Sequence, residues 1–297
     1  MSWEPHTITT EEVVEHGPVV ALSALFDDGI PAPAIGDDLP PLWHSVALPR
    51  WPRSSSLDVD GHPARGSFLP PINLPRRMFA GGEVVFHSGL SIGSTVRRES
   101  TVVSVTEKDG RSGRLVVVVV ESRLFDEHGA LAVEETQDFI YREAGAVGST
   151  EASAIEAAPD LSPVGAPLRR AGEWTWGFAT DPTLLMRFSA ATSNPHRIHY
   201  DWPYATRVEG YPGLVVHGPL MTLALAEVLR LEQHPARVAR LRHRNRKPLF
   251  CGQPAQLRRA EEATPDAVTL GLFGPDACPH TTLTIEFDSS QKGSSNA

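Results

Sequence analysis

The sequence has few cysteines and no long apolar run. Its two cysteines, Cys251 and Cys278, stand in neither a paired metal-binding spacing nor a Cys-x-x-Cys redox motif. No stretch of 18 apolar residues occurs, and the N-terminus lacks the basic and apolar segments of a secretion signal. These absences predict a protein of the reduced cytoplasm that neither spans a membrane nor binds one.

Positive charge is also scarce. With 27 Lys and Arg against 36 Asp and Glu, the formal net charge is -9. A general nucleic-acid surface is therefore excluded, because binding to the phosphate backbone needs clustered cations. Two local basic clusters, Arg76–Arg77 and residues 240–247, are candidates for the phosphates of a small ligand. A solvated strand face explains the second cluster equally well.

The first half of the chain combines a helix, a long loop and strands. Thr9 or Thr10 is a candidate cap for a helix over residues 10–26 with acidic residues in its first turn. Residues 27–75, dense in Pro and Asp, follow as an irregular stretch whose length indicates a functional or surface-wrapping role. Four β-branched segments within 83–142 predict an antiparallel meander. We therefore assign residues 1–142 to an N-terminal domain.

The second half repeats this order after a Ser-, Ala- and Pro-rich linker at 143–170. A helix is expected at 182–191, and another, apolar on nearly every side, at 217–233; four strands follow. Such an apolar helix is buried, so we expect a sheet wrapped around it. Residues 171–288 form the predicted C-terminal domain with the active site, and 289–297 a disordered tail. The fold class is α+β.

A polar loop separates the two helices of the second half. Its sequence, TSNPHRIHYD, brings Asn194, His196 and His199 together. Imidazole titrates near neutrality and can both take and give a proton at cellular pH. A lone histidine usually serves only structure, but this clustering in a polar loop makes His199 the leading candidate for an acid or base.

The start of the apolar helix is the second candidate element. In GYPGLVVHGPLMTLALAEVL the glycines permit tight turns, and Gly218 lets a ligand approach the backbone where the helix begins. The unpaired N–H groups of a helix start, together with the helix dipole, suit an oxyanion. Simple helix packing would also explain these glycines, and the nearby histidine loop is what strengthens the functional interpretation.

These two motifs together resemble the MaoC-like, or type 2 enoyl-CoA, hydratases and dehydratases. The segments TSNPHRIHYD and VEGYPGLVVHGPL are similar to a double-hotdog subgroup that hydrates mesaconyl-C4-CoA or itaconyl-CoA, and GHPARGSFLPPINLPRRMFAGGEVVFHSGLSIGS resembles its first hotdog. The resemblance implies a double hotdog with two antiparallel sheets, each wrapped around a central helix. It implies a hydro-lyase acting on a short-chain 2-enoyl-CoA, above all a C5 dicarboxylic thioester.

The resemblance also implies roles for single residues. His199 aligns with the catalytic histidine and would activate water, whereas Asn194 stands where the family has an aspartate and would orient that water through its carbonyl oxygen. The N–H of Gly218 would stabilise the enolate. His196 would share proton transfer, bind the distal carboxylate or pack. The expected substrate-binding residues are Arg197, the better carboxylate candidate because a guanidinium can bind two oxygens, with His217, Arg76, Arg77, Tyr211 and Gly213.

Other interpretations remain open. A metal hydrolase would use His196, His199 and His217, but their spacing fits no closed zinc motif. A non-catalytic acyl-CoA-binding module would bind thioesters without turnover. Within the enzyme class, the alternative is a 3-hydroxyacyl-thioester dehydratase of fatty-acid or polyketide synthesis, acting on CoA or acyl-carrier-protein substrates. We expect no cofactor, with coenzyme A present only as part of the substrate, no metal, and a homodimer.

Overall fold

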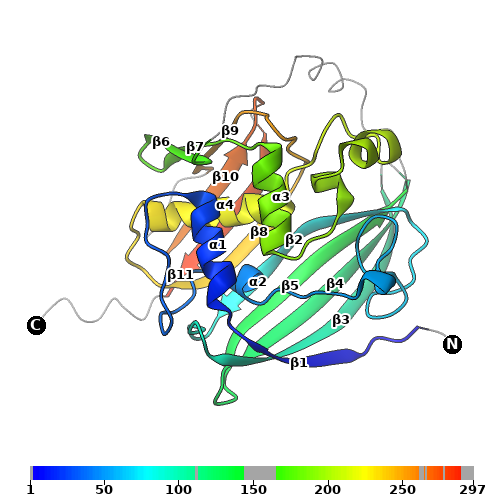
Figure 1. The fold of residues 1–297 in the computed structure, drawn as a ribbon, viewed down its shortest axis with the longest axis horizontal. Helices are drawn as coiled ribbons and strands as arrows, with labels where there is room; N and C mark the ends of the chain where they lie inside the picture. Colours follow the sequence, from blue (N-terminus) through cyan, green and yellow to red (C-terminus); the bar gives the residue numbers. More distant parts are fainter. Residues whose placement is uncertain are drawn as a thin grey trace, which may run out of the picture.

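The computed structural model describes residues 3–110, 113–143, 165–260, 264, 266–276 and 278–288. Within them, eleven strands form one antiparallel sheet in the order β1-β3-β4-β5-β2-β8-β11-β10-β9-β7-β6 (Figure 1). The strands are β1 (Thr7–Val13), β2 (Arg76–Phe86), β3 (Thr95–Gly110), β4 (Gly113–Phe125), β5 (Leu131–Arg142), β6 (Leu168–Gly172), β7 (Thr175–Phe178), β8 (Val238–Asn245), β9 (Ala255–Arg259), β10 (Ala267–Phe273) and β11 (Pro279–Phe287).

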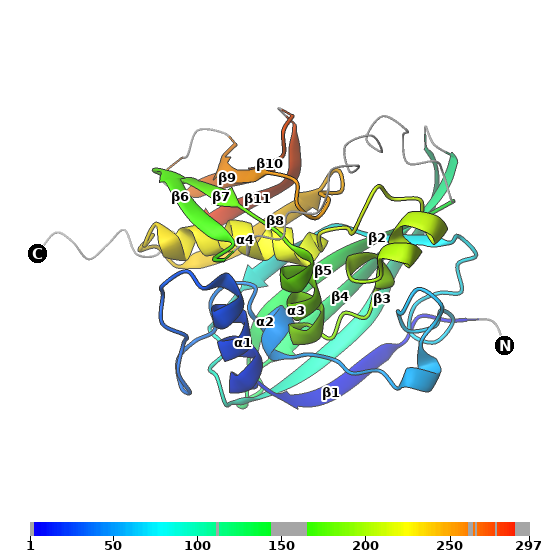
Figure 2. The same cartoon turned by 45° about the horizontal axis from the view of Figure 1, so that its top comes forward.

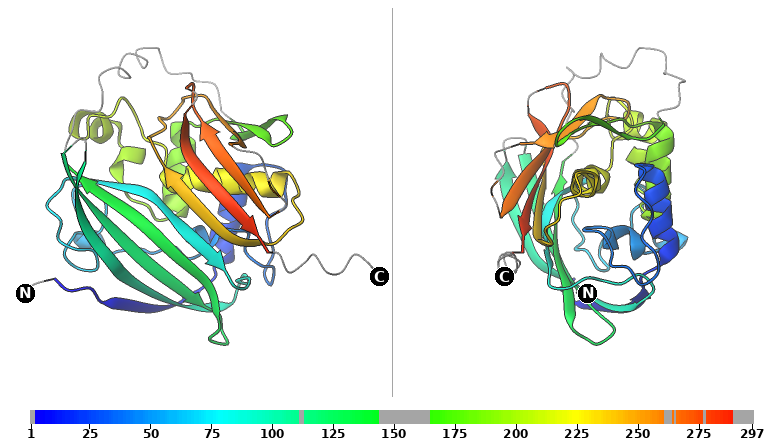
Figure 3. Two further views of the ribbon diagram at one scale, coloured as in Figure 1. Left: turned by 180° about the vertical axis from the view of Figure 1, so that it is seen from behind. Right: turned by 90° about the vertical axis from the view of Figure 1, so that its left-hand side faces the viewer.

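The apolar helix predicted in the second half is α4, which lies inside the curved sheet. Its residues from Leu220 to Leu229 are all buried. Figures 2 and 3 show α4 between the sheet on one side and α1 and α3 on the other. The helices are α1 (His16–Phe26), α2 (His44–Ala47), α3 (Pro182–Ala191) and α4 (Gly218–Leu231), with short turns η1 (Ser54–Ser56), η3 (Arg197–His199) and η4 (Tyr204–Val208).

The two halves of the chain meet where β2 pairs with β8. This ladder runs from Gly81 opposite Arg244 to Val85 opposite Arg240. The described sheet is therefore continuous, whereas we predicted two separate sheets. The physical reason is that each half would otherwise end in an open strand edge, and pairing satisfies the backbone groups of both edges. Arg242 of β8 also forms an ion pair with Glu83 of β2 across this seam.

The predicted helix over residues 10–26 is wrong at its beginning. Residues Thr7–Val13 form β1, which pairs with β3 from Thr7 opposite Thr101 to Val13 opposite Thr95. Their β-branched side chains suit an edge strand better than a helix. The helix begins at His16, with Glu15 at the N-cap, so neither Thr9 nor Thr10 caps it. Pro18 falls in the first turn, where a missing N–H has no cost.

The predicted linker at 143–170 falls mostly outside the described residues, and the predicted tail at 289–297 falls wholly outside them. The predicted end of the linker at residue 170 is wrong, because Leu168–Gly172 forms β6 and pairs with β7. The irregular stretch at 27–75 contains only α2 and η1 as helical segments. In the described part of the chain, no helix combines the length and apolarity needed to cross a membrane.

Candidate active site

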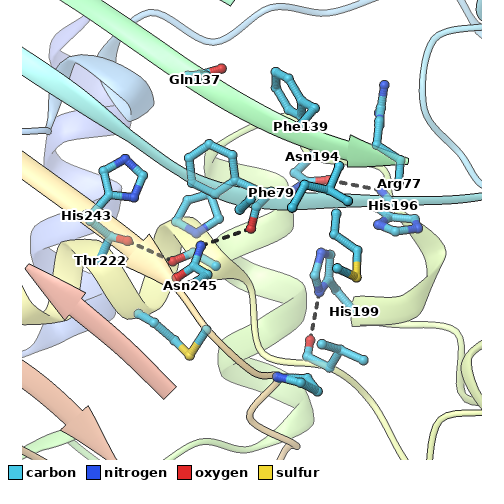
Figure 4. A pocket seen from close by; sticks show the side chains of 18 of the residues that line it. Arg77, Phe79, Gln137, Phe139, Asn194, His196, His199, Thr222, His243 and Asn245 are labelled. Atoms are coloured by element: carbon cyan, nitrogen blue, oxygen red, sulfur yellow. Dashed lines mark hydrogen bonds between the residues drawn. The ribbon is translucent and has the colours of Figure 1, made fainter. Parts of the chain in front are cut away.

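A cavity of about 630 Å³ opens at the seam between the two halves (Figure 4). Its walls come from α4, from strands β2, β5 and β8, from the polar loop that contains Asn194, and from two parts of the 27–75 stretch. Of the predicted catalytic residues, Asn194, His196, His199 and Gly218 all line it. The structure therefore brings together the histidine loop and the start of α4.

His199 is held in one orientation by a backbone carbonyl. The Nδ1–H of its ring donates to the carbonyl oxygen of Val215 at 2.7 Å, which leaves Nε2 as a proton acceptor. The side chain is buried, and burial lowers the pKa of His199 to about 3 because the charged form loses its hydration. His199 is therefore a neutral imidazole at physiological pH.

His217, the N-cap of α4, packs directly behind His199. The two rings are stacked, with centroids 3.6 Å apart and an interplanar angle of 19°. Nε2 of His217 lies 2.8 Å from the hydroxyl of Ser189. His217 is fully buried and does not line the cavity, so it supports His199 rather than contacting a ligand. The stacked rings cannot direct two lone pairs at one ion, which argues against the metal set of His196, His199 and His217.

Asn194 shapes the loop through its side-chain oxygen. Oδ1 accepts a hydrogen bond from the N–H of His196 at 3.1 Å, an Asx turn that precedes η3. One lone pair of the predicted water-orienting oxygen is therefore occupied by the backbone. Burial, together with the neighbouring His62 and His199, lowers the pKa of His196.

Gly218 begins α4 and packs tightly against side chains of the facing strands. A Cβ on Gly218 would lie 2.7 Å from Nδ2 of Asn245 and 3.2 Å from Cδ1 of Phe79. Asn245 itself is fixed, because it donates to the carbonyl of Phe79 and accepts from the hydroxyl of Thr281. A larger residue would displace Asn245 or Phe79, and Gly218 itself lines the cavity at the start of the helix, where the first N–H groups lack partners within the helix.

Sequence reasoning missed a third histidine, His62, which lines the cavity from the N-terminal half. Its Nδ1 lies 3.1 Å from Oδ2 of Asp60, and its ring centroid is 4.2 Å from that of His196. The ligand atoms of Asp60, His62 and His196 lie within 4.8 Å of one another, a spacing that a metal ion could also use. The only signal in the sequence was an Asp-Gly-His segment inside a loop long enough to be functional.

A second polar cluster occupies the other end of the cavity. Nε2 of His44 lies 3.4 Å from Oε2 of Glu135, and Gln137 donates to the other oxygen of Glu135 at 2.9 Å. Burial raises the pKa of Glu135, but these partners outweigh it and hold the pKa at about 2. Burial also lowers the pKa of the neighbouring His243 to about 4. No local sequence pattern indicates this cluster, because its members come from three distant elements.

The predicted substrate-binding residues divide into two groups. Arg77 and Tyr211 line the cavity, but Arg76, Arg197 and Gly213 do not. Arg76 is buried and forms an ion pair with Glu209. The guanidinium of Arg197 binds Asp201 at 2.7 Å and the carbonyl of Val59 at 3.1 Å, so it fastens the loop.

Comparisons with known proteins identify relatives of the whole chain. The family model of hydroxyacyl-thioester dehydratase type 2 matches residues 42–251. The chain is 41% identical over 288 residues to a mesaconyl-C(4)-CoA hydratase of Chloroflexus aurantiacus, covering 96% of this chain and 97% of the relative.

Two solved structures share the fold. A MaoC-like dehydratase of Phytophthora capsici superposes with a TM-score of 0.64 at 15% identity, covering 96% of each chain. A Mycobacterium tuberculosis protein described as a double hotdog superposes with a TM-score of 0.55 at 16% identity, covering 97% of this chain and 94% of that one. The predicted family resemblance and the predicted enzyme class, a hydro-lyase, are confirmed. The chain belongs to the hydroxyacyl-thioester dehydratase type 2 family.

Proposed function

We propose that the protein adds water across the double bond of a short 2-enoyl-CoA that also carries a free carboxylate. Such a substrate is a C5 dicarboxylic thioester, for example mesaconyl-C4-CoA or itaconyl-CoA. The observation that carries this proposal is the identity of 41% over nearly the whole chain to a mesaconyl-C(4)-CoA hydratase. The cavity supports it, because a buried imidazole with a free Nε2 and the start of a buried helix line the same space.

The chemistry follows from these two features. Nε2 of His199 takes a proton from water as the oxygen bonds to the β-carbon, and the electrons of the double bond move onto the thioester oxygen. The N–H of Gly218 then stabilises that enolate oxygen. A positioned acid or base typically contributes about 10²–10⁴-fold in rate, and an oxyanion donor about 3 kcal/mol. Asn194 orients the attacking water with the lone pair that its backbone hydrogen bond leaves free.

Arg77 is our candidate for the substrate carboxylate. In a five-carbon dicarboxylic enoyl thioester the free carboxylate lies within one carbon of the double bond, so its partner must lie near the catalytic histidines. The positive charge of Arg77 helps to lower the pKa of both His62 and His196. Arg77 and His196 also occupy the same end of the cavity (Figure 4). Arg246 and Lys247, which also line the cavity, are our candidates for the phosphates of coenzyme A.

We also propose that the two halves of the sheet are two hotdog units, residues 1–142 and 168–288; the second unit begins at β6, three residues before the boundary predicted at 171. The seam between β2 and β8 supports this division, because five strands lie on its N-terminal side and six on the other. In this arrangement the C-terminal unit supplies His199 and α4, while the N-terminal unit supplies one wall of the cavity.

The test is the decay of conjugated thioester absorbance when purified protein meets mesaconyl-C4-CoA, itaconyl-CoA or crotonyl-CoA. The proposal expects turnover of a dicarboxylic substrate with a kcat/KM well above that of crotonyl-CoA. Preference for crotonyl-CoA or longer monocarboxylic chains would instead identify a 3-hydroxyacyl-thioester dehydratase. Binding of all three without turnover would identify an acyl-CoA-binding module.

A further inference from the structure

His62, which lines the cavity, forms a pair with the carboxylate of Asp60, and the reaction above uses neither residue. His62 belongs to the loop of the N-terminal half, 137 positions before His199 in the sequence, and its side chain is only 18% exposed. Asp60 binds it twice: Oδ1 accepts the backbone N–H of His62 at 2.8 Å, and Oδ2 lies 3.1 Å from Nδ1. A carboxylate oxygen can only accept, so Nδ1 carries the proton and Nε2 is the basic nitrogen.

A tight turn over residues 58–62 is built against the histidine loop of the other half. The backbone N–H of Arg197 donates to the carbonyl of Asp60 at 3.0 Å, and Nη1 of Arg197 donates to the carbonyl of Val59 at 3.1 Å. Gly61, at φ +92°, touches the backbone of Pro195 so closely that a Cβ would lie 2.0 Å from its carbonyl oxygen. Three independent contacts therefore fix His62 relative to His196 and His199.

His199 has no carboxylate partner of its own, since its Nδ1 binds the neutral carbonyl of Val215. Asp201, the acidic residue of the same loop, is tied to Arg197. Glu135, the carboxylate that lines the described cavity, is engaged by His44 and Gln137. A positive charge on an imidazole in this buried space is best stabilised beside a carboxylate, and of the three histidines at this end only His62 is in contact with one.

Resting on the function proposed above, we propose that His62, oriented by Asp60, is the second acid–base residue of the reaction and exchanges the proton at the α-carbon. In the hydration direction His199 receives the proton of the attacking water. That proton passes through His196, whose ring centroid lies 5.4 Å from that of His199 and 4.2 Å from that of His62. As the enolate re-forms the thioester carbonyl, its α-carbon takes the proton from Nε2 of His62. One water is added, and no net proton is gained or lost.

In this scheme Asp60 is a positioning residue that never contacts the substrate. Its charge stabilises the transient imidazolium, and its two hydrogen bonds select the tautomer of His62. Asp60→Asn keeps the acceptor of the turn but removes the charge. It should therefore lower kcat about tenfold or more while KM and the melting temperature change little. His62→Gln should lower kcat about 10²-fold or more, the range expected for a positioned acid or base.

The experiment follows the α-proton separately from overall turnover. The 3-hydroxyacyl-CoA product is incubated in D₂O with the wild-type protein, His62→Gln, Asp60→Asn or the control His87→Gln. Deuterium at the α-carbon is measured by mass spectrometry, and dehydration by absorbance. His87 is a matched control, because it makes an equivalent contact of 3.0 Å with Glu134 on an exposed strand end.

The proposal expects that His62→Gln loses α-exchange and turnover together, and that His87→Gln matches the wild type. In a further variant, His62→Ala, added imidazole should partly restore turnover. Near-normal α-exchange in His62→Gln would overturn it. Loss of wild-type activity on metal removal, with one bound ion restored by readdition, would also overturn it, because Asp60, His62 and His196 would then be metal ligands. A wild-type protein that turns over none of the thioesters defeats the proposed function itself.

Discussion

At the scale of single residues, the cavity relies on histidines kept neutral by burial. His199 can accept a proton because its Nδ1–H is committed to Val215 and its Nε2 is not. His217, behind it, has no contact with the cavity and acts through stacking. The difference between a reacting and a supporting imidazole therefore lies in what each ring nitrogen binds, which residue identity alone does not reveal.

Arg77 should decide which substrates are preferred. Arg77→Met should lower kcat/KM for a dicarboxylic thioester about 10–100-fold, because a hydrogen bond to a charged group contributes about 1.5–3 kcal/mol. Crotonyl-CoA, which lacks the second carboxylate, should be turned over at a nearly unchanged rate. Parallel assays with both substrates measure this, and Arg114→Met, on an exposed surface ion pair with Glu107, is the control. Equal losses with both substrates would show that Arg77 does not recognise the carboxylate.

At the scale of elements, the site depends on the contact between the turn over residues 58–62 and the histidine loop at residues 192–201. Gly61→Ala should reduce kcat by about tenfold or more, because the new Cβ would collide with the carbonyl oxygen of Pro195 and displace His62. Gly36 is a matched control: it has φ +93°, and no atom lies within 4 Å of the position that its Cβ would take. Both variants incur the left-handed strain of about 1 kcal/mol, and Gly61→Ala adds the collision with Pro195, so thermal melting should report the larger loss for Gly61→Ala. If Gly36→Ala loses as much activity as Gly61→Ala, backbone strain rather than the contact is responsible.

The start of α4 should be equally sensitive to added bulk. Gly218→Ala should abolish most activity while leaving the fold intact, since its Cβ would meet Asn245 and Phe79 rather than the core. Activity and circular dichroism measured together decide this. Normal activity in that variant would exclude close approach of the thioester at this point.

Several elements followed from the sequence because their signals are local. The helix at 182–191 matches α3, and the apolar helix at 217–233 matches α4 within two residues. His199 and Gly218, which the sequence assigned to one site, both line the cavity, and their catalytic roles stay predictions. The sequence pattern predicted the wrong structure where pairing between distant segments determines it. Residues Thr7–Val13 form a strand because they pair with the edge of β3. His62 and Glu135 were missed for the same reason, since they reach the site through contacts between distant segments.

At the scale of the whole molecule, the buried histidines link stability to pH. The pKa of His199 is lowered to about 3 and that of His243 to about 4 from an ordinary value of 6.5. Between these values the unfolded chain binds protons that the native state does not, so the free energy of unfolding decreases as pH falls. From pH 7 to pH 5 each histidine should cost about 2 kcal/mol.

Urea unfolding at pH 7 and pH 5 measures this loss. His243→Gln should remove about 2 kcal/mol of the difference. Glu135 should not contribute in this window, because its lowered pKa affects stability only below the ordinary pKa of a carboxyl group, near 4.5. An unfolding free energy that stays constant between the two pH values would show that these histidines are not buried in the neutral form.

The sheet that joins the two halves also leaves β1 and β6 as its terminal strands. The homodimer expected from the sequence stays a prediction, which light scattering on the eluting protein would decide. A measured mass of 32.2 kDa, that of a single chain, would exclude the dimer.

The function proposed for the cavity at the seam, hydration of a dicarboxylic enoyl-CoA, depends on His199. The initial rate of absorbance loss with mesaconyl-C4-CoA tests it, recorded for the wild-type protein and His199→Ala at equal concentration. We predict clear turnover by the wild type and a loss of about 10²-fold or more in a variant that is still folded. Equal rates in the two proteins, or no hydration by the wild type, would refute this function.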